Sequence, residues 1–155
     1  MKKKVLIVED ESPKQKNLTK FFSENYCDFE LLFAMSVGAA LDEIEDSDLD
    51  LVILDMSLPT TDVGDKESGG RPQGFGGLEV LTNITILGKI IPVIVLTGYE
   101  SFLKEEGDVS LDKLRDEWMA LYPNVLRGVL HYSSTYGNWI DELRNLISDM
   151  LKSKK

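Results

Sequence analysis

The chain alternates between short apolar runs and longer segments in which apolar residues recur every three or four positions. Five runs rich in Val, Ile, Leu and Phe lie at residues 5–8, 29–34, 51–54, 91–96 and 125–132. Most of them are continuous rather than alternating, which is typical of strands covered on both faces of a parallel sheet. We therefore expect five buried strands.

The segments between these runs predict helices. Ser12, Pro13 and Gln15 fit a capping box in which Ser12 is the N-cap of the first helix, and Ser36 fits the N-cap of the second. Further helices are expected over residues 78–87, within 99–121 and along the apolar stripe from Trp139 to Leu151. Five strand–helix repeats predict an α/β fold, with a doubly wound five-stranded parallel sheet and helices on both faces.

Composition narrows the possible functions. With 155 residues and 43% hydrophobic content, the chain is expected to form one folded domain. A net charge of −10 argues against binding to nucleic acid or to an anionic membrane, since either partner requires a basic face. Cys27 is the only cysteine, so no internal disulfide can form, and we expect a cytoplasmic location. The apolar run after the MKKK start is too short for a signal peptide or a membrane span.

Polar residues follow three of the predicted strands at their carboxyl ends. Glu9 and Asp10 follow the first run, Asp55 follows the third, and Thr97 follows the fourth. Ligands of doubly wound sheets bind at this edge, so these side chains are expected to converge. Crowded carboxylates repel one another unless a cation or a proton intervenes, and oxygen ligands suit Mg²⁺. Each residue alone could serve a helix terminus or a turn, but together they favour a functional site.

Four segments in this order resemble the receiver domains of two-component response regulators: VLIVEDE (5–11), LVILDMSLP (51–59), GLEVL (77–81) and IPVIVLTG (91–98). The resemblance implies a flavodoxin-like fold with strand order 2-1-3-4-5 and a single receiver domain over residues 1–155. It also implies phosphoryl transfer to an aspartate from a sensor histidine kinase, a phosphotransfer protein or a small phosphodonor. The phosphorylated domain would then switch a contact with a downstream protein.

The same resemblance assigns residues to roles. Asp55 matches the phospho-accepting aspartate, and Glu9 and Asp10 match the acidic pair that holds Mg²⁺ together with Asp55. The backbone carbonyl of Ser57 matches a further metal ligand. Residues that match the phosphoryl-sensing hydroxyl and the aromatic switch position are Thr97 and Tyr132.

The chain departs from the family at the end of the fifth strand. Receivers carry a lysine there, but Thr135 stands at or next to that position, and no lysine or arginine lies between Leu130 and Asp141. Two insertions are also expected, at residues 63–76 and within 99–124, the second as a lengthened helix or a helix pair. Lys66 and Arg71 lie in the first insertion, on the same sheet edge as Asp55. We hypothesise that one of them replaces the missing lysine.

Three functions remain open. The first is a phospho-accepting receiver that is not an enzyme beyond self-phosphorylation and auto-dephosphorylation. The second is a pseudo-receiver, a binding module that works without phosphorylation, which the missing lysine favours. The third is a Mg²⁺-dependent phosphohydrolase of the haloacid dehalogenase type. Those enzymes usually carry a second aspartate two residues after the nucleophile, where this chain has Ser57.

Overall fold

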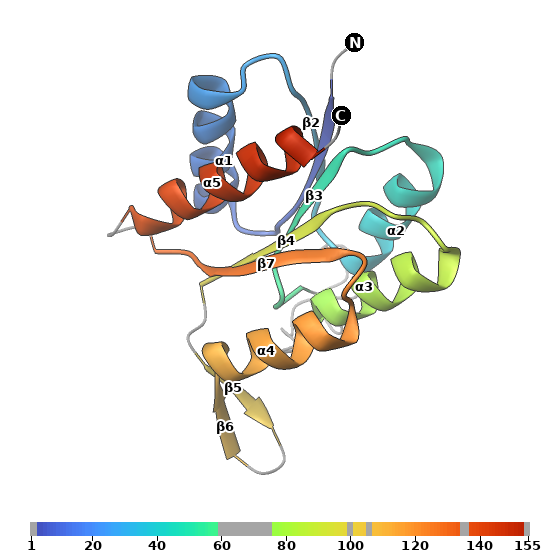
Figure 1. The fold of residues 1–155 in the computed structure, drawn as a ribbon, viewed down its shortest axis with the longest axis vertical. Coiled ribbons are helices and arrows are strands. Elements are labelled where there is room, and N and C mark those ends of the chain that lie inside the picture. Colours follow the sequence, from blue (N-terminus) through green and yellow to red (C-terminus); the bar gives the residue numbers. More distant parts are fainter. Residues whose placement is uncertain (1–2, 59–75, 99–100, 105–106, 134–136, 154–155) are drawn as a thin grey trace.

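A parallel five-stranded sheet forms the centre of the molecule (Figure 1). In this computed structural model, residues 3–58, 76–98, 101–104, 107–133 and 137–153 are described. The sheet strands are β1 (Lys4–Val8), β2 (Glu30–Ala34), β3 (Leu51–Leu54), β4 (Val93–Thr97) and β7 (Leu126–His131). Their order, β2-β1-β3-β4-β7, confirms the predicted order 2-1-3-4-5 and the flavodoxin-like fold.

Helices cover both faces of the sheet. The helices are α1 (Ser12–Asn25), α2 (Val37–Asp46), α3 (Gly76–Leu87), α4 (Leu111–Leu121) and α5 (Asn138–Ser153). In Figure 1, α1 and α5 lie on one side of the sheet, and α2, α3 and α4 lie on the other. No helix among the described residues is long and apolar enough to cross a membrane.

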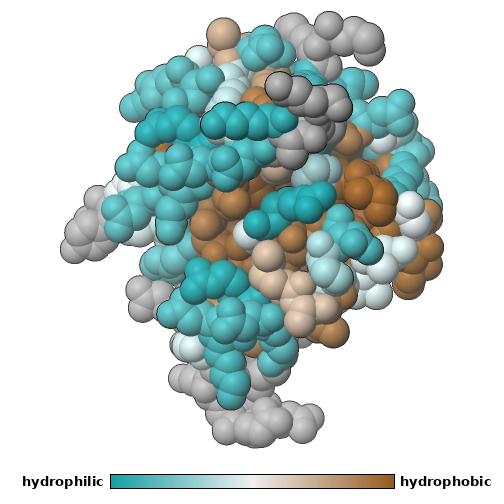
Figure 2. Space-filling model, in the orientation of Figure 1, coloured by the Kyte–Doolittle hydropathy of each residue, from teal (hydrophilic) through white to brown (hydrophobic). Residues whose placement is uncertain are grey.

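Two hydrophobic cores result from this layering. Because successive side chains of a strand point to opposite faces, Leu6 and Val8 of β1 join the core beneath α2, α3 and α4. Val5 and Ile7 join the core beneath α1 and α5. The strands therefore read as continuous apolar runs, as expected from the sequence. Figure 2 shows further hydrophobic surface at the centre of the view, between α5 and α4.

Two predictions about local structure were wrong. Glu11, not Ser12, is the N-cap of α1, and it makes no side-chain capping hydrogen bond. Gln15 instead donates from Nε2 to the backbone carbonyl of Glu9, at 2.6 Å. Residues 101–110 do not extend a helix, because β5 (Ser101–Lys104) and β6 (Gly107–Ser110) form an antiparallel hairpin before α4. The N-cap predicted at Ser36 is confirmed, since its hydroxyl accepts a hydrogen bond from the Ala39 amide.

Candidate phosphoryl and metal site

The acidic residues meet at the carboxyl edge of the sheet. β1 and β3 are parallel neighbours with Val8 opposite Leu54, so Glu9 and Asp55 leave the sheet at the same level. Glu9 is 1% exposed and Asp55 is 6% exposed. One carboxylate oxygen from each of Glu9, Asp10 and Asp55 lies within 4.8 Å of the others. The structure therefore brings together the three carboxylates that the sequence singled out.

Burial makes this cluster electrostatically costly. Loss of hydration, opposed by Lys14 and reinforced by Asp55, raises the pKa of Glu9 from 4.5 to about 7. Burial likewise raises the pKa of Asp10. A bound cation would remove this penalty by favouring the ionised carboxylates.

The donor set fits Mg²⁺. Glu9 Oε1 and Asp55 Oδ1 are buried and accept no hydrogen bond of good geometry from the described residues. Converging carboxylate oxygens are the ligands that Mg²⁺ takes in proteins. Ser57, buried two residues after Asp55, would add its backbone carbonyl by the family match.

The predicted sensing residues lie on the neighbouring strands. Thr97 is fully buried at the end of β4, the strand next to β3. Tyr132 follows β7, and its backbone amide donates to the carbonyl of Thr97 at 2.8 Å. The Tyr132 hydroxyl accepts a hydrogen bond from Asn17 Nδ2 at 2.6 Å, and its ring lies 5.1 Å from that of Trp139. Thr97 and Tyr132 are thus joined through the backbone of adjacent strands.

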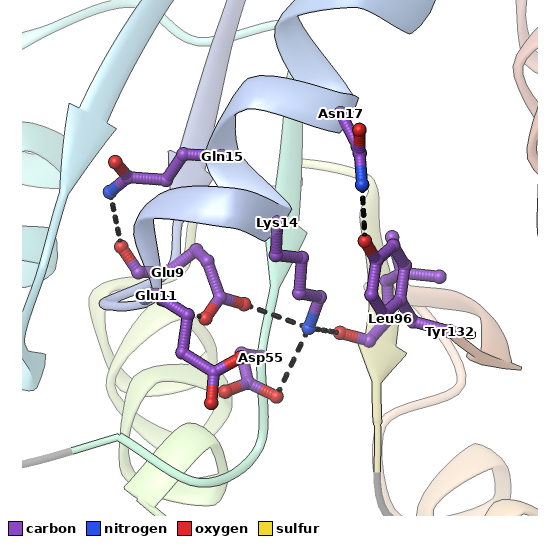
Figure 3. Close-up of polar contacts among 8 residues, drawn as sticks. All are labelled: Glu9, Glu11, Lys14, Gln15, Asn17, Asp55, Leu96 and Tyr132. Atoms are coloured by element: carbon purple, nitrogen blue, oxygen red, sulfur yellow. Dashed lines mark hydrogen bonds and ion pairs between the residues drawn. The ribbon is translucent and has the colours of Figure 1, made fainter. Parts of the chain in front are cut away.

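A buried lysine enters the cluster from α1. Figure 3 shows the Lys14 side chain pointing between Glu9 and Asp55. Its Nζ lies 2.7 Å from Glu9 Oε1 and 3.4 Å from Asp55 Oδ1, and it donates to the carbonyl of Leu96 at 2.5 Å. The Tyr132 ring lies beside it, with its centroid 5.3 Å from Nζ. The sequence did not single out Lys14 as a site residue.

The spacing of apolar residues in α1 could have predicted that Lys14 is buried. Residues three or four positions apart on a helix share a face, and Lys14 precedes Leu18 by four and Phe21 by seven. Leu18 and Phe21 form the buried face of α1, so Lys14 continues an apolar stripe. Its place in the expected capping segment made it resemble an ordinary solvated lysine.

The proposed substitute cations Lys66 and Arg71 lie outside the described residues, and so does Thr135. Among the described residues, Lys14 is the cation that the structure places beside Asp55.

Comparisons with known proteins agree with the fold. The model of the response regulator receiver domain matches residues 5–107. The Detocs response regulatory protein DtcB from Enterobacter cloacae is 24% identical over 149 residues, which cover 95% of this chain and 99% of that protein.

Two solved structures share the architecture. The phosphorylated cyanobacterial phytochrome response regulator RcpA superposes with a TM-score of 0.68 at 19% identity, covering 100% of this chain and 98% of that chain. The response regulator TrrA from Thermotoga maritima, in complex with Mg²⁺-BeF, has a TM-score of 0.62 at 22% identity, covering 93% and 98%. At these identities the likeness establishes the fold.

Proposed function

This chain belongs to the response regulator receiver domain family, and on that premise we propose that it accepts a phosphoryl group on Asp55 with Mg²⁺ bound beside it. Receiver domains are generally signalling modules rather than enzymes, and they interact with histidine kinases or phosphotransfer proteins. The observation that carries the proposal is the convergence of three carboxylates, two of them buried, at one edge of the sheet. A scaffold without phosphoryl chemistry has no use for so costly a cluster.

The proposed reaction needs little proton chemistry. A carboxylate oxygen of Asp55 attacks the phosphorus of a phosphohistidine in line, while the nitrogen–phosphorus bond breaks and the imidazole nitrogen keeps the electron pair. Glu9, Asp10, Asp55 and the Ser57 carbonyl would hold the metal. When bound, Mg²⁺ supplies neutralising charge to the transferred group. Water later attacks the same phosphorus, the bond between phosphorus and the Asp55 oxygen breaks, and inorganic phosphate leaves while the Asp55 carboxylate is restored.

The response would run through Thr97 and Tyr132. A phosphoryl group adds a charge of about −1.5 to −2 and three acceptor oxygens. The Thr97 hydroxyl, one strand away from Asp55, is suited to hydrogen-bond one of these oxygens. Since Tyr132 is hydrogen-bonded to the Thr97 backbone, a shift of Thr97 would be transmitted to the surface around Tyr132.

A mass measurement tests the proposal. We expect wild type, incubated with Mg²⁺ and acetyl phosphate, to gain the mass of one phosphoryl group. Asp55→Asn should gain none, while Asp46→Asn, at an exposed position of α2, should behave as wild type. No adduct on wild type, even with a partner kinase, would support the pseudo-receiver instead. Sustained release of phosphate from many substrates would support a phosphohydrolase.

A further inference from the structure

The Lys14 ammonium is buried to an unusual degree. Its side chain is 3% exposed, although lysine is rarely buried unless it is paired. Removing an ammonium from water costs several kcal/mol, and this cost must be offset by charges of opposite sign. Glu9 and Asp55 supply them, at 2.7 and 3.4 Å. The position of Lys14 is therefore coupled to the carboxylates of the candidate site.

The Lys14 ammonium also lies close to the carboxyl end of β7, the fifth strand of the parallel sheet. Lys14 reaches from α1 to the carbonyl of Leu96, the residue before Thr97 on β4. β4 pairs with β7, and Tyr132, directly after β7, has its ring 5.3 Å from the ammonium. Lys14 thus carries a positive charge to the β4–β7 side of Asp55. At the carboxyl end of β7, where the family carries its lysine, no lysine or arginine lies between Leu130 and Asp141 in the sequence.

We infer that Lys14 is the cation that binds the phosphoryl group on Asp55, in place of the family lysine that is missing after β7. This inference rests on the proposed function. A phosphoryl group on Asp55 would bring negative charge to a site that already holds three carboxylates, so a fixed cation is required near its oxygens. Lys14 Nζ lies 3.4 Å from Asp55 Oδ1 and needs only a small displacement to contact such an oxygen.

The competing explanation is a structural counterion. In that case Lys14 would only neutralise Glu9 and Asp55 while no metal is bound, and Mg²⁺ would take over its role. The two explanations differ in what removal of the ammonium does. A counterion affects the carboxylates and their metal, whereas a phosphoryl-binding cation affects the phosphoryl group after the metal is already bound.

A binding experiment separates them. We expect Lys14→Met to bind Mg²⁺ alone at least as tightly as wild type, because no ammonium competes for the oxygens of Glu9 and Asp55. With Mg²⁺ saturating, its affinity for beryllofluoride should fall by roughly 10- to 100-fold, the effect of losing one hydrogen bond between charged groups. Lys20→Met, at an exposed position of the same helix, is the matched control and should bind both probes as wild type does.

An NMR measurement on wild type does not depend on folding of the variant. With Mg²⁺ bound, addition of beryllofluoride should shift the Nζ resonance of Lys14 and leave that of Lys20 in place. Unchanged beryllofluoride affinity in Lys14→Met, or an unmoved Lys14 resonance, would overturn the inference. So would a beryllofluoride loss in Lys66→Met or Arg71→Met that Lys14→Met does not show.

The phosphorylation assay keeps the two proposals apart. If wild type takes no phosphoryl group on Asp55, the proposed function fails and this inference fails with it. If wild type and Lys14→Met are phosphorylated at equal rates by acetyl phosphate, only the role of Lys14 is overturned. We expect acetyl phosphate to phosphorylate Lys14→Met more slowly than wild type, by about the same factor as the fall in beryllofluoride affinity.

Discussion

At the residue scale, the same type of side chain acts differently according to its burial. Lys14 and Lys16 lie two positions apart on α1, yet Lys14 is buried against carboxylates and Lys16 is exposed. Glu9 and Glu11 differ in the same way. Only Glu9 is buried, and desolvation raises its pKa to about 7. Whether a charged side chain takes part in this site therefore depends on whether it points into the protein or into solvent, not on its residue type.

The raised pKa of Glu9 predicts a pH-dependent stability in the metal-free protein. The value is 4.5 in the unfolded reference and about 7 in the fold, so the folded protein binds more protons between these values. The free energy of unfolding should therefore fall as pH rises across this window, with the stabilisation complete below 4.5. Urea denaturation in EDTA from pH 5 to 7.5 measures this slope.

Two variants test whether Glu9 causes this pH dependence of the free energy of unfolding. Glu9→Gln removes the titrating carboxyl and should flatten the slope, whereas Glu45→Gln, exposed near the end of α2, should keep it. Equal slopes in wild type and Glu9→Gln would show that Glu9 does not titrate in this range.

At the element scale, the start of α3 is packed against the segment that carries Asp55. A Cβ atom added to Gly77 would lie 2.7 Å from the Asp55 carbonyl oxygen and 2.7 Å from Met56 Sδ. The amide of Gly77 donates to the Met56 carbonyl at 2.9 Å. Glycine is thus required by close approach of two backbones, and α3 holds the site loop in place.

Gly77→Ala is predicted to damage both stability and the site. In an unobstructed helix this change stabilises by about 1 kcal/mol, but here overpacking should destabilise by about 1–3 kcal/mol. Phosphorylation by acetyl phosphate should slow, because the Asp55 backbone must move. Gly98→Ala is the control, since an added Cβ there meets no atom within 4 Å. Urea denaturation and the mass assay measure the two effects, and a stabilised Gly77→Ala would contradict the packing argument.

At the scale of the whole molecule, the segment between β4 and β7 separates into a packed part and a projecting part. α4 belongs to the core, with Leu114 and Trp118 buried beneath it. The hairpin of β5 and β6 pairs only with itself among the described strands, and Figure 1 shows it extending away from the sheet. Ser110, the last residue of β6, caps α4 by accepting a hydrogen bond from the Lys113 amide, so a change confined to residues 101–108 leaves this cap in place.

Replacement of residues 101–108 by a short Gly/Ser linker is therefore expected to leave cooperative unfolding and Asp55 phosphorylation close to wild type. Trp118→Ala should instead cost about 3–5 kcal/mol of stability, because it leaves a large cavity beneath α4. Thermal and urea unfolding with the mass assay test both variants. A loss of folding on hairpin replacement would show that the hairpin supports the core.

The sequence by itself determined the five strands of the parallel sheet, their alternation with helices, and the meeting of Glu9, Asp10 and Asp55. These follow from local patterns, because continuous apolar runs mark buried parallel strands and residues after such strands share one edge. The hairpin was missed because its two four-residue strands, SFLK and GDVS, carry no clear hydrophobic period.

Only the tertiary structure decided which charge lies beside Asp55. Lys14 meets the Leu96 carbonyl 82 positions away in the chain, and no local pattern encodes such a contact. A lysine side chain is long enough to leave its own helix and lie among the ends of other strands. Its partners are therefore set by how α1 packs on the sheet, which the residues near Lys14 do not specify.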